Sequence, residues 1–317
     1  MRLKYMPKIL LSVLLFLTCK LAAAQLTYNT LFVDYDSAKT FKNLKIIPIR
    51  FKGGGNAAAV PRLITLNEAI EKGYVNVSER GSASTENVHW LRINNSSVFP
   101  VYIGSGEIIL GGRQDRMVSK DTVLTPTGSD QYVPVMCVEE GRWSDKEKKF
   151  AYNNYAYPQL RKVLGQSNNQ VLIWKEVYSH LDYNGINSSS LAYASRRQDK
   201  KFAPVLEEYV QYFKDKFSNS DSTVTGIVCI SGDKVIGCDV FGTTRMFYGE
   251  LIPLLQGYIE EAATYGKPPA LSDEKVKEYL DNFLKDETSQ ENYLEEKKNG
   301  KLFKYKEKVV HITAYAQ

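Results

Sequence analysis

Two short stretches of this chain place charged side chains and glycines against apolar runs. The first covers residues 106–116 and the second covers residues 138–143. An unpaired carboxylate in a packed sheet is costly, so we expect the acids and arginines of these stretches to contact one another. A guanidinium group can also bind phosphate or carboxylate through two parallel hydrogen bonds. The charged set consists of Glu107, Asp115, Glu139, Glu140, Arg113, Arg116 and Arg142.

Two interpretations of this set stay open. In the structural one, the arginines neutralise the acids and tie strands together, and Trp143 anchors the chain where it leaves the sheet. In the functional one, the arginines and the N–H groups of Gly111 and Gly112 hold an anion, Trp143 stacks on a ring, and a carboxylate binds sugar hydroxyls or acts as a base. The candidate ligand-binding residues are Gly111, Gly112, Arg113, Gln114, Arg116, Arg142 and Trp143. The candidate catalytic residues are Glu107, Asp115, Glu139 and Glu140.

Most familiar catalytic motifs are missing from the sequence. The three histidines, His89, His180 and His311, are scattered, and no HExxH, CxxC or EF-hand pattern occurs, so we predict neither a metal site nor a cofactor. There is no GxSxG elbow. The glycines of residues 104–106 lie between two predicted strands and do not precede a helix, which argues against a dinucleotide fingerprint.

The first 24 residues have the pattern of a secretory signal peptide. A basic start is followed by an apolar stretch over residues 9–18 and by three alanines at 22–24. We therefore expect cleavage before Gln25 and a periplasmic or extracellular protein. The apolar stretch is too short for a membrane span, which needs ~20 residues, and no later stretch approaches that length. A lipid anchor on Cys19 is disfavoured because Thr18 and Lys20 flank it, where small residues would be expected.

The charge of the chain is mostly carried by this leader. Residues 1–24 hold four basic residues and no acid, so their removal lowers the formal charge from +5 to +1. We therefore do not expect nucleic acid as a partner. Protein partners cannot be inferred from the sequence.

The periodicity of the sequence changes near residue 150. Before it, short strands joined by turns are predicted at 44–51, 74–78, 88–94, 99–103, 107–110, 117–124 and 132–138, with one helix at 65–73. After it, amphipathic helices are predicted at 157–164, 170–181, 202–217, 247–265 and 273–286, with strands at 226–230, 235–241, 302–305 and 309–315. We predict an α+β fold in which an antiparallel β-rich half (25–150) packs with a mixed α/β half (151–317) and shares one core with it.

Three cysteines remain after the leader. Cys137 lies in an apolar strand, where a small core residue is favoured over a nucleophile. A two-residue turn at 232–233 would place Cys229 opposite Ile236, so a disulfide with Cys238 requires a longer loop. Two small core residues are the favoured interpretation, and the disulfide stays open.

The two charged motifs resemble those of a bacterial and archaeal family named for its association with ADP-ribosylglycohydrolases and rhodanese-like phosphatases. The similarity rests on Gly106-Glu107, Gly111 to Arg116, Val133-Pro134-Val135, Cys137-Val138-Glu139 and Gly141-Arg142-Trp143. Weaker matches are Leu66-Asn67-Glu68-Ala69, Gln170 to Trp174, Asp239 to Phe241 and His311. The resemblance implies a family without an assigned activity, linked by gene association to the metabolism of NAD or ADP-ribose.

The sequence thus favours an exported protein that binds a phosphorylated or sugar-containing small molecule, with nucleotides and ADP-ribose-like compounds first among the candidates. One alternative is a metal-independent hydrolase of such a compound, with two of the four candidate acids as acid and base. The other is a structural protein of the cell envelope.

Overall fold

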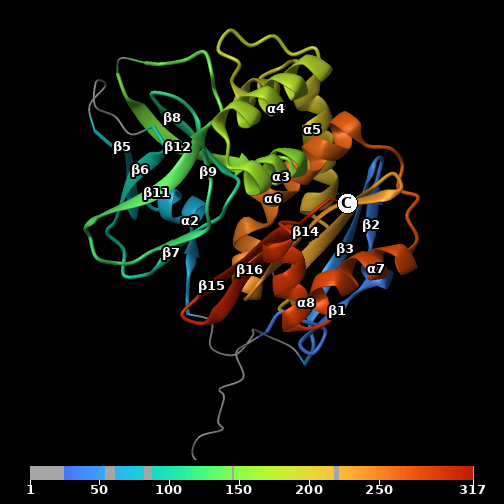
Figure 1. Cartoon of the computed structure of the whole chain (residues 1–317). Coiled ribbons are helices and arrows are strands. Elements are labelled where there is room, and N and C mark those ends of the chain that lie inside the picture. Colours follow the sequence, from blue (N-terminus) through green and yellow to red (C-terminus); the bar gives the residue numbers. More distant parts are fainter. Residues whose placement is uncertain (1–24, 54–60, 82–87, 145, 218–220, 317) are drawn as a thin grey trace, which may run out of the picture.

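The computed structural model describes residues 25–53, 61–81, 88–144, 146–217 and 221–316 (Figure 1). The predicted leader, residues 1–24, lies outside this part of the chain. The predicted α+β class, with antiparallel sheets and a strand-rich first half, is confirmed. Within the described residues, no helix has both the length and the apolar content to cross a bilayer.

A seven-stranded sheet joins the two halves of the chain. Its order is β1-β3-β13-β14-β16-β15, and β2 pairs with β3. All of its pairs are antiparallel, and β3, from the β-rich half, pairs with β13. The strands are β1 (Leu31–Val33), β2 (Lys39–Phe41), β3 (Leu44–Phe51), β13 (Val224–Ser231), β14 (Lys234–Phe241), β15 (Gly300–Tyr305) and β16 (Lys308–Tyr315).

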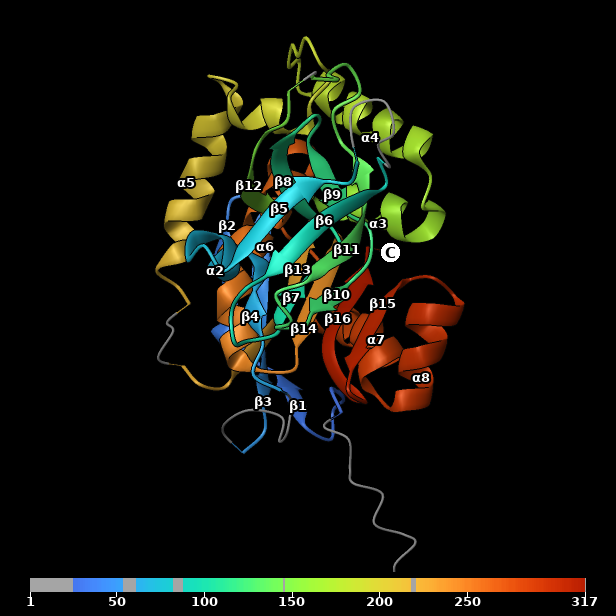
Figure 2. The same cartoon turned by 90° about the vertical axis from the view of Figure 1, so that its left-hand side faces the viewer.

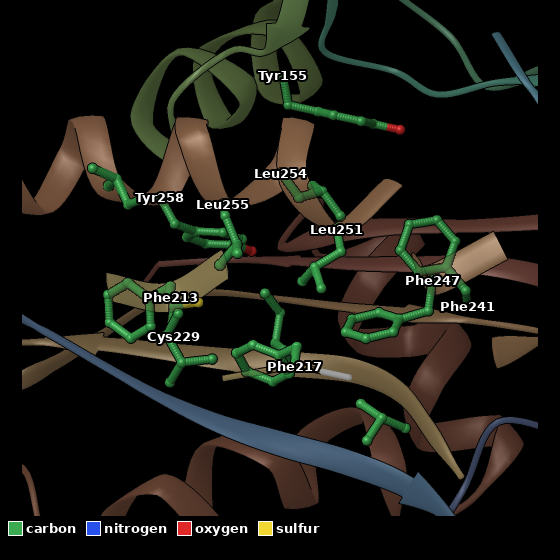
Figure 3. Close-up of a cluster of buried hydrophobic side chains, with 14 of the residues drawn as sticks. Tyr155, Phe213, Phe217, Cys229, Phe241, Phe247, Leu251, Leu254, Leu255 and Tyr258 are labelled. Carbon is green, nitrogen blue, oxygen red and sulfur yellow. The ribbon is translucent and has the colours of Figure 1, made fainter. Parts of the chain in front are cut away.

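Helices cover both faces of this sheet (Figures 1 and 2). Helices α5 (Phe202–Lys214) and α6 (Thr244–Tyr265) pack on one face, and α7 (Asp273–Leu284) and α8 (Glu287–Glu291) lie on the other side. Neighbouring strand residues point to opposite faces, so Ile46 belongs to the core with α6 and Ile47 to the core with α7. Figure 3 shows part of the first core, which includes Leu251 and Leu254 of α6 and Phe241 of β14.

The remaining strands form a second β layer. A six-stranded sheet has the order β12-β8-β9-β11-β6-β5, and a three-stranded sheet has the order β10-β7-β4, in which β4 and β7 are parallel. The strands are β4 (Ile64–Thr65), β5 (Val75–Glu79), β6 (Trp90–Asn95), β7 (Val101–Ile103), β8 (Glu107–Gly112), β9 (Arg116–Val118), β10 (Thr122–Leu124), β11 (Asp130–Cys137) and β12 (Lys148–Tyr155).

Both faces of this layer are also buried. Ile109 of β8 packs in a core that includes residues of α2 (Leu66–Glu71), and Ile108 packs in a core with α3 (Pro158–Ser167) and α4 (Gln170–Tyr183). Thr65 caps the start of α2, since its hydroxyl accepts from the backbone N–H of Glu68 over 3.2 Å. Strands β8 and β9 therefore lie between two hydrophobic cores, and this packing holds the motifs that they carry in position.

The strands differ from the expectation at two places. The predicted strand at 117–124 is divided into β9 and β10, which belong to different sheets, with Asp121 between them. Strand β12 was not predicted, because its sequence begins with Lys148 and Lys149 and shows no apolar alternation. It forms through pairing with β8, which a local pattern does not reveal.

The hairpin of β13 and β14 differs in register from the expectation. A bulge after Cys229 places this residue opposite Gly237, and not opposite Ile236. Cys229 lies in the core with α6, as Figure 3 shows, whereas Cys238 lies in the core with α7. Because the two thiols are on opposite faces of one sheet, they cannot form a disulfide, and both are free and buried. Cys137 is also buried.

Candidate functional site

The connection between β8 and β9 folds the first motif into a tight turn. Gly111 and Gly112 have φ angles of +120° and +52°. A Cβ atom at Gly111 would collide with the backbone carbonyl of Lys149, so glycine is required there. The N–H of Gly111 donates to Oδ1 of Asp115 over 2.9 Å. This N–H group, which we had considered for an external anion, is therefore occupied by a carboxylate of the same motif.

Arg142 joins the second motif to the first. Its Nε donates to Oε2 of Glu139 over 2.6 Å, and its Nη2 donates to Oδ1 of Asp115 over 2.9 Å. Its Nη1 and Nη2 also donate to the carbonyls of Gly112 and Gly111, over 3.1 and 3.2 Å. The planar fork is thus used within the protein. We call Asp115, Glu139 and Arg142 the motif cluster.

Arg116 has a partner outside the predicted set. Its Nη2 lies 3.3 Å from both carboxylate oxygens of Glu79, at the end of β5, and its Nη1 donates to the carbonyl of Gln114 over 2.7 Å. Arg116 and Glu79 are both buried. This ion pair ties β5 to β9 inside the sheet, as in the structural interpretation.

Arg113, Gln114 and Trp143 hold the two motifs together. The Arg113 N–H donates to Oε1 of Glu79 over 2.7 Å, and its Nη1 donates to the carbonyl of Ser144 over 2.7 Å. The Arg113 guanidinium lies 6.0 Å from the ring centre of Trp143, which is 44% exposed. The Gln114 amide donates to the carbonyl of Glu139 over 2.8 Å. These contacts position the motif cluster.

The structure separates two of the candidate acids from the motif cluster. Glu140 is exposed. Glu107 is fully buried and accepts from the backbone N–H of Gly104 and from the hydroxyl of Tyr152, over 3.1 and 3.3 Å. Burial and the neighbouring carboxylate of Glu250, on α6, raise the pKa of Glu107 well above its ordinary value. Of the four candidate acids, Asp115 and Glu139 therefore belong to the motif cluster, and Glu107 and Glu140 lie outside it.

The two carboxylates of the motif cluster have different surroundings. Oε1 of Glu139 accepts from the hydroxyl of Ser190 over 2.7 Å, and Oε2 accepts from the backbone N–H of Asp115 over 3.2 Å. Burial, followed by the charge of Glu139, raises the pKa of Asp115, although the hydrogen bond from Gly111 and the charge of Arg142 act against this rise. Two acids in such unequal surroundings suit either the binding of hydroxyl groups or proton transfer.

A cleft of about 970 Å³ opens beside the motif cluster. One wall carries Asp115, Glu139 and Arg142, and the facing wall is the segment 184–201 between α4 and α5. We call it the motif cleft. Its polar lining consists of the serines Ser188, Ser189, Ser190 and Ser195, the amides Asn184, Asn187 and Gln198, the carboxylate Asp199, and the lysines Lys148, Lys200 and Lys201.

A second polar group lies at the junction of the two β layers and was not predicted. His311 of β16 lies between two acids: its Nε2 is 3.0 Å from Oδ1 of Asp239, and its Nδ1 is 3.3 Å from Oδ1 of Asp121. The Tyr102 hydroxyl donates to Asp121 over 2.7 Å, and Arg161 binds Asp239 through two bonds of 2.9 and 2.6 Å. We call these five residues, all buried, the inner network.

The charges of the inner network stabilise one another. Burial alone would raise the pKa of Asp121, but the hydrogen bond and the charge of His311 outweigh it and lower this pKa to about 2. The Arg161 guanidinium likewise outweighs burial and holds the pKa of Asp239 well below its ordinary value. Burial lowers the pKa of His311, yet its two acidic partners raise it overall. Asp121 is therefore ionised at neutral pH, and the two carboxylates favour the protonated form of His311.

A family comparison matches residues 32–315 to the ARG and Rhodanese-Phosphatase-superfamily-associated Protein domain. No curated protein and no solved structure matches the chain. The match extends from β1 to the end of β16, so it includes both the motif cleft and the inner network. The chain therefore belongs to the ARG and Rhodanese-Phosphatase-superfamily-associated Protein domain family.

Proposed function

We propose that this protein is exported and that the motif cleft binds a phosphorylated or sugar-containing small molecule, with nucleotides and ADP-ribose-like compounds first among the candidates. The observation that carries the proposal is the position of the cleft, because the two specific motifs of the sequence form one of its walls. Its volume of about 970 Å³ falls within the range of small-molecule sites, which extends from roughly 300 to 1,000 Å³.

The lining offers separate partners for the two parts of such a ligand. Carboxylates and serine hydroxyls accept hydrogen bonds from sugar hydroxyls, and Asp115, Glu139 and Ser190 lie together on this lining. Lysine is a common partner of phosphate, and Lys200 and Lys201 are exposed on the facing wall.

Arg142 has a different role from the one first considered. Its fork already serves Asp115, Glu139 and two carbonyls. We therefore assign phosphate contacts to the lysines and give Arg142 the task of holding the two carboxylates in position. This division explains why an arginine and two acids stand together beside a cleft that has further basic residues of its own.

A metal-independent hydrolase is the second candidate. It is favoured by the neighbouring carboxyl groups of Asp115 and Glu139, which share Arg142, since two adjacent carboxyl groups can act as acid and base. Under this proposal, Asp115→Asn and Glu139→Gln would each abolish turnover of a bound compound without abolishing its binding. A structural role in the envelope is the outcome if no ligand is found.

A thermal-shift series tests the binding proposal. Purified protein is heated with ADP-ribose, AMP, ribose or inorganic phosphate. A ligand at 100 times its dissociation constant stabilises the fold by ~2.7 kcal/mol, which raises the melting temperature of a protein of this size by roughly 5 °C or more. We expect the largest rise with ADP-ribose or AMP. Equal melting temperatures with and without each compound would contradict ligand binding, and the structural role in the envelope would then be the remaining alternative.

A further inference from the structure

A second cavity, of about 300 Å³, lies against the inner network and shares no lining residue with the motif cleft. It is enclosed by the β9–β10 connection, the end of α3, the segment that follows α8, and β15. Asp121 belongs to its lining, and so do Lys120, Lys298, Lys301 and Glu295. The cavity thus connects solvent with one end of a buried charge network.

Only one of the two carboxylate oxygens of Asp121 is hydrogen-bonded within the described residues. Oδ1 accepts from the Tyr102 hydroxyl over 2.7 Å and from the backbone N–H of Ser105 over 3.4 Å, and it lies 3.3 Å from Nδ1 of His311. Within the described part of the chain, Oδ2 has no hydrogen-bond partner, although the residue is only 7% exposed. Because Oδ1 is turned toward the inner network, Oδ2 is the oxygen that faces the cavity. An ionised carboxylate oxygen held in this way accepts a hydrogen bond from a ligand donor.

The charges around the cavity indicate what else the ligand carries. Inside the inner network, Oδ1 of Asp121 lies against His311, and Arg161 forms an ion pair with Asp239. The remaining lining has three lysines against Glu295, which leaves two positive charges in excess. Lys301 is fixed by donating to the hydroxyl of Ser105 over 2.5 Å and to a backbone carbonyl, whereas Lys120 and Lys298 are exposed. A phosphate monoester, with a charge of roughly −2, matches this excess.

We propose that this cavity is a second ligand site, which takes a small hydroxylated phosphate monoester: Asp121 accepts its hydroxyl group, and Lys120, Lys298 and Lys301 bind its phosphate. The volume of about 300 Å³ is at the lower end of small-molecule sites, so the site suits a molecule much smaller than a dinucleotide.

The site is tested by calorimetric titration of the full mature chain with glycerol 3-phosphate and, separately, with inorganic phosphate. In the wild-type protein, glycerol 3-phosphate should bind more tightly than inorganic phosphate. Asp121→Asn removes a negative charge but also a strong acceptor. It should therefore weaken the binding of glycerol 3-phosphate at least 10-fold and tighten the binding of inorganic phosphate. If Asp121 only repelled phosphate, the variant would bind both ligands more tightly.

Two further variants keep the test decisive if Asp121→Asn fails to fold. Lys120→Gln and Lys298→Gln change exposed side chains that make no contact with the inner network in the structure, and each should weaken both ligands several-fold. Lys214→Gln, on α5, is the matched control and should change neither. Titrations repeated with saturating ADP-ribose should give the same affinity for glycerol 3-phosphate. A failure of binding at the motif cleft therefore stays distinguishable from a failure at the second site. The absence of glycerol 3-phosphate binding, or equal binding by the wild-type, Lys120 and Lys298 proteins, would overturn the proposal.

Discussion

Nε of Arg142 donates a 2.6 Å hydrogen bond to Oε2 of Glu139, three residues earlier in the chain. The same guanidinium reaches Asp115 in the other motif, over 2.9 Å. The two motifs are therefore one unit, and the arginine between them is neutralised before any ligand arrives. Under the proposed function, Arg142 therefore supports one wall of the motif cleft, and other residues of the cleft contact the ligand.

The first prediction concerns the stability that Arg142 provides. Arg142→Ala leaves Asp115 and Glu139 unpaired with side chains only 10% and 5% exposed, so the free energy of unfolding should fall by about 3 kcal/mol. Arg142→Lys keeps the charge but loses the fork, and its loss should be smaller. Urea denaturation followed by circular dichroism measures both.

The control for this prediction is Arg92→Ala. The Arg92–Asp130 pair spans 3.7 Å with both side chains about half exposed, so the loss should stay below about 1 kcal/mol. A loss for Arg142→Ala no greater than for Arg92→Ala would show that the motif cluster is not held by its arginine.

The second prediction is a pH dependence that originates in Glu250. Burial raises the pKa of this α6 carboxyl, which lies against Glu107, to about 8. A carboxyl with a raised folded-state pKa favours the folded protein at pH values below its unfolded pKa, about 4.5, and this contribution is lost as the pH rises through about 8. The loss from this group should reach about 1.4 kcal/mol per pH unit.

Glu250→Gln should therefore flatten the decline in melting temperature between pH 5 and pH 8. Glu278→Gln, an exposed change on α7, should follow the wild-type profile. His311 adds a decline of the same sign that begins above its ordinary pKa of 6.5, since its pKa is also raised, and this part should persist in Glu250→Gln. Parallel profiles for the wild-type protein and Glu250→Gln would contradict the assignment.

The third prediction concerns the cysteines. Cys229 and Cys238 point into different cores, so they should remain thiols. Alkylation in denaturant without reductant, followed by mass spectrometry, should label both Cys229 and Cys238. A peptide pair joined through Cys229 and Cys238 would mean that the β13–β14 register is different from the one described.

The fourth prediction concerns the leader. The charged start, the apolar stretch and the three alanines predict that the mature protein begins at Gln25. Protein recovered from the periplasm or the medium should give this residue in N-terminal sequencing. An intact Met1, or an acylated Cys19, would contradict the export proposal.

Local patterns accounted for most of the fold. The apolar run of β3 records burial on both faces of its sheet. The three- and four-residue spacing of the buried residues in α5 records the burial of one helix face. Strand β12 was not predicted, because its pairing with β8 overrides a polar sequence. The bulge after Cys229 was not predicted either, because nothing in the turn residues specifies it.

The candidate site was predictable only in part, for the same reason. Asp115, Glu139 and Arg142 come from two dense motifs, and their contact followed from the cost of unpaired charge. Glu79 lies 37 residues from Arg116 in an unremarkable strand end. The inner network draws on segments spread from Tyr102 to His311, so only the sheet topology brings its residues together. The serines at 188–190 were the one local signal that could have indicated the facing wall of the cleft.

Titration calorimetry of ADP-ribose tests the central claim most directly. The measurement compares the wild-type protein with Lys200→Gln/Lys201→Gln, which changes the exposed wall of the motif cleft, and with the matched pair Lys214→Gln/Lys216→Gln, whose exposed lysines lie near the end of α5. We predict binding by the wild-type protein, an affinity at least 10-fold weaker in the cleft variant, and unchanged binding in the control. No heat of binding, or equal affinity in all three proteins, would contradict a ligand site in the motif cleft.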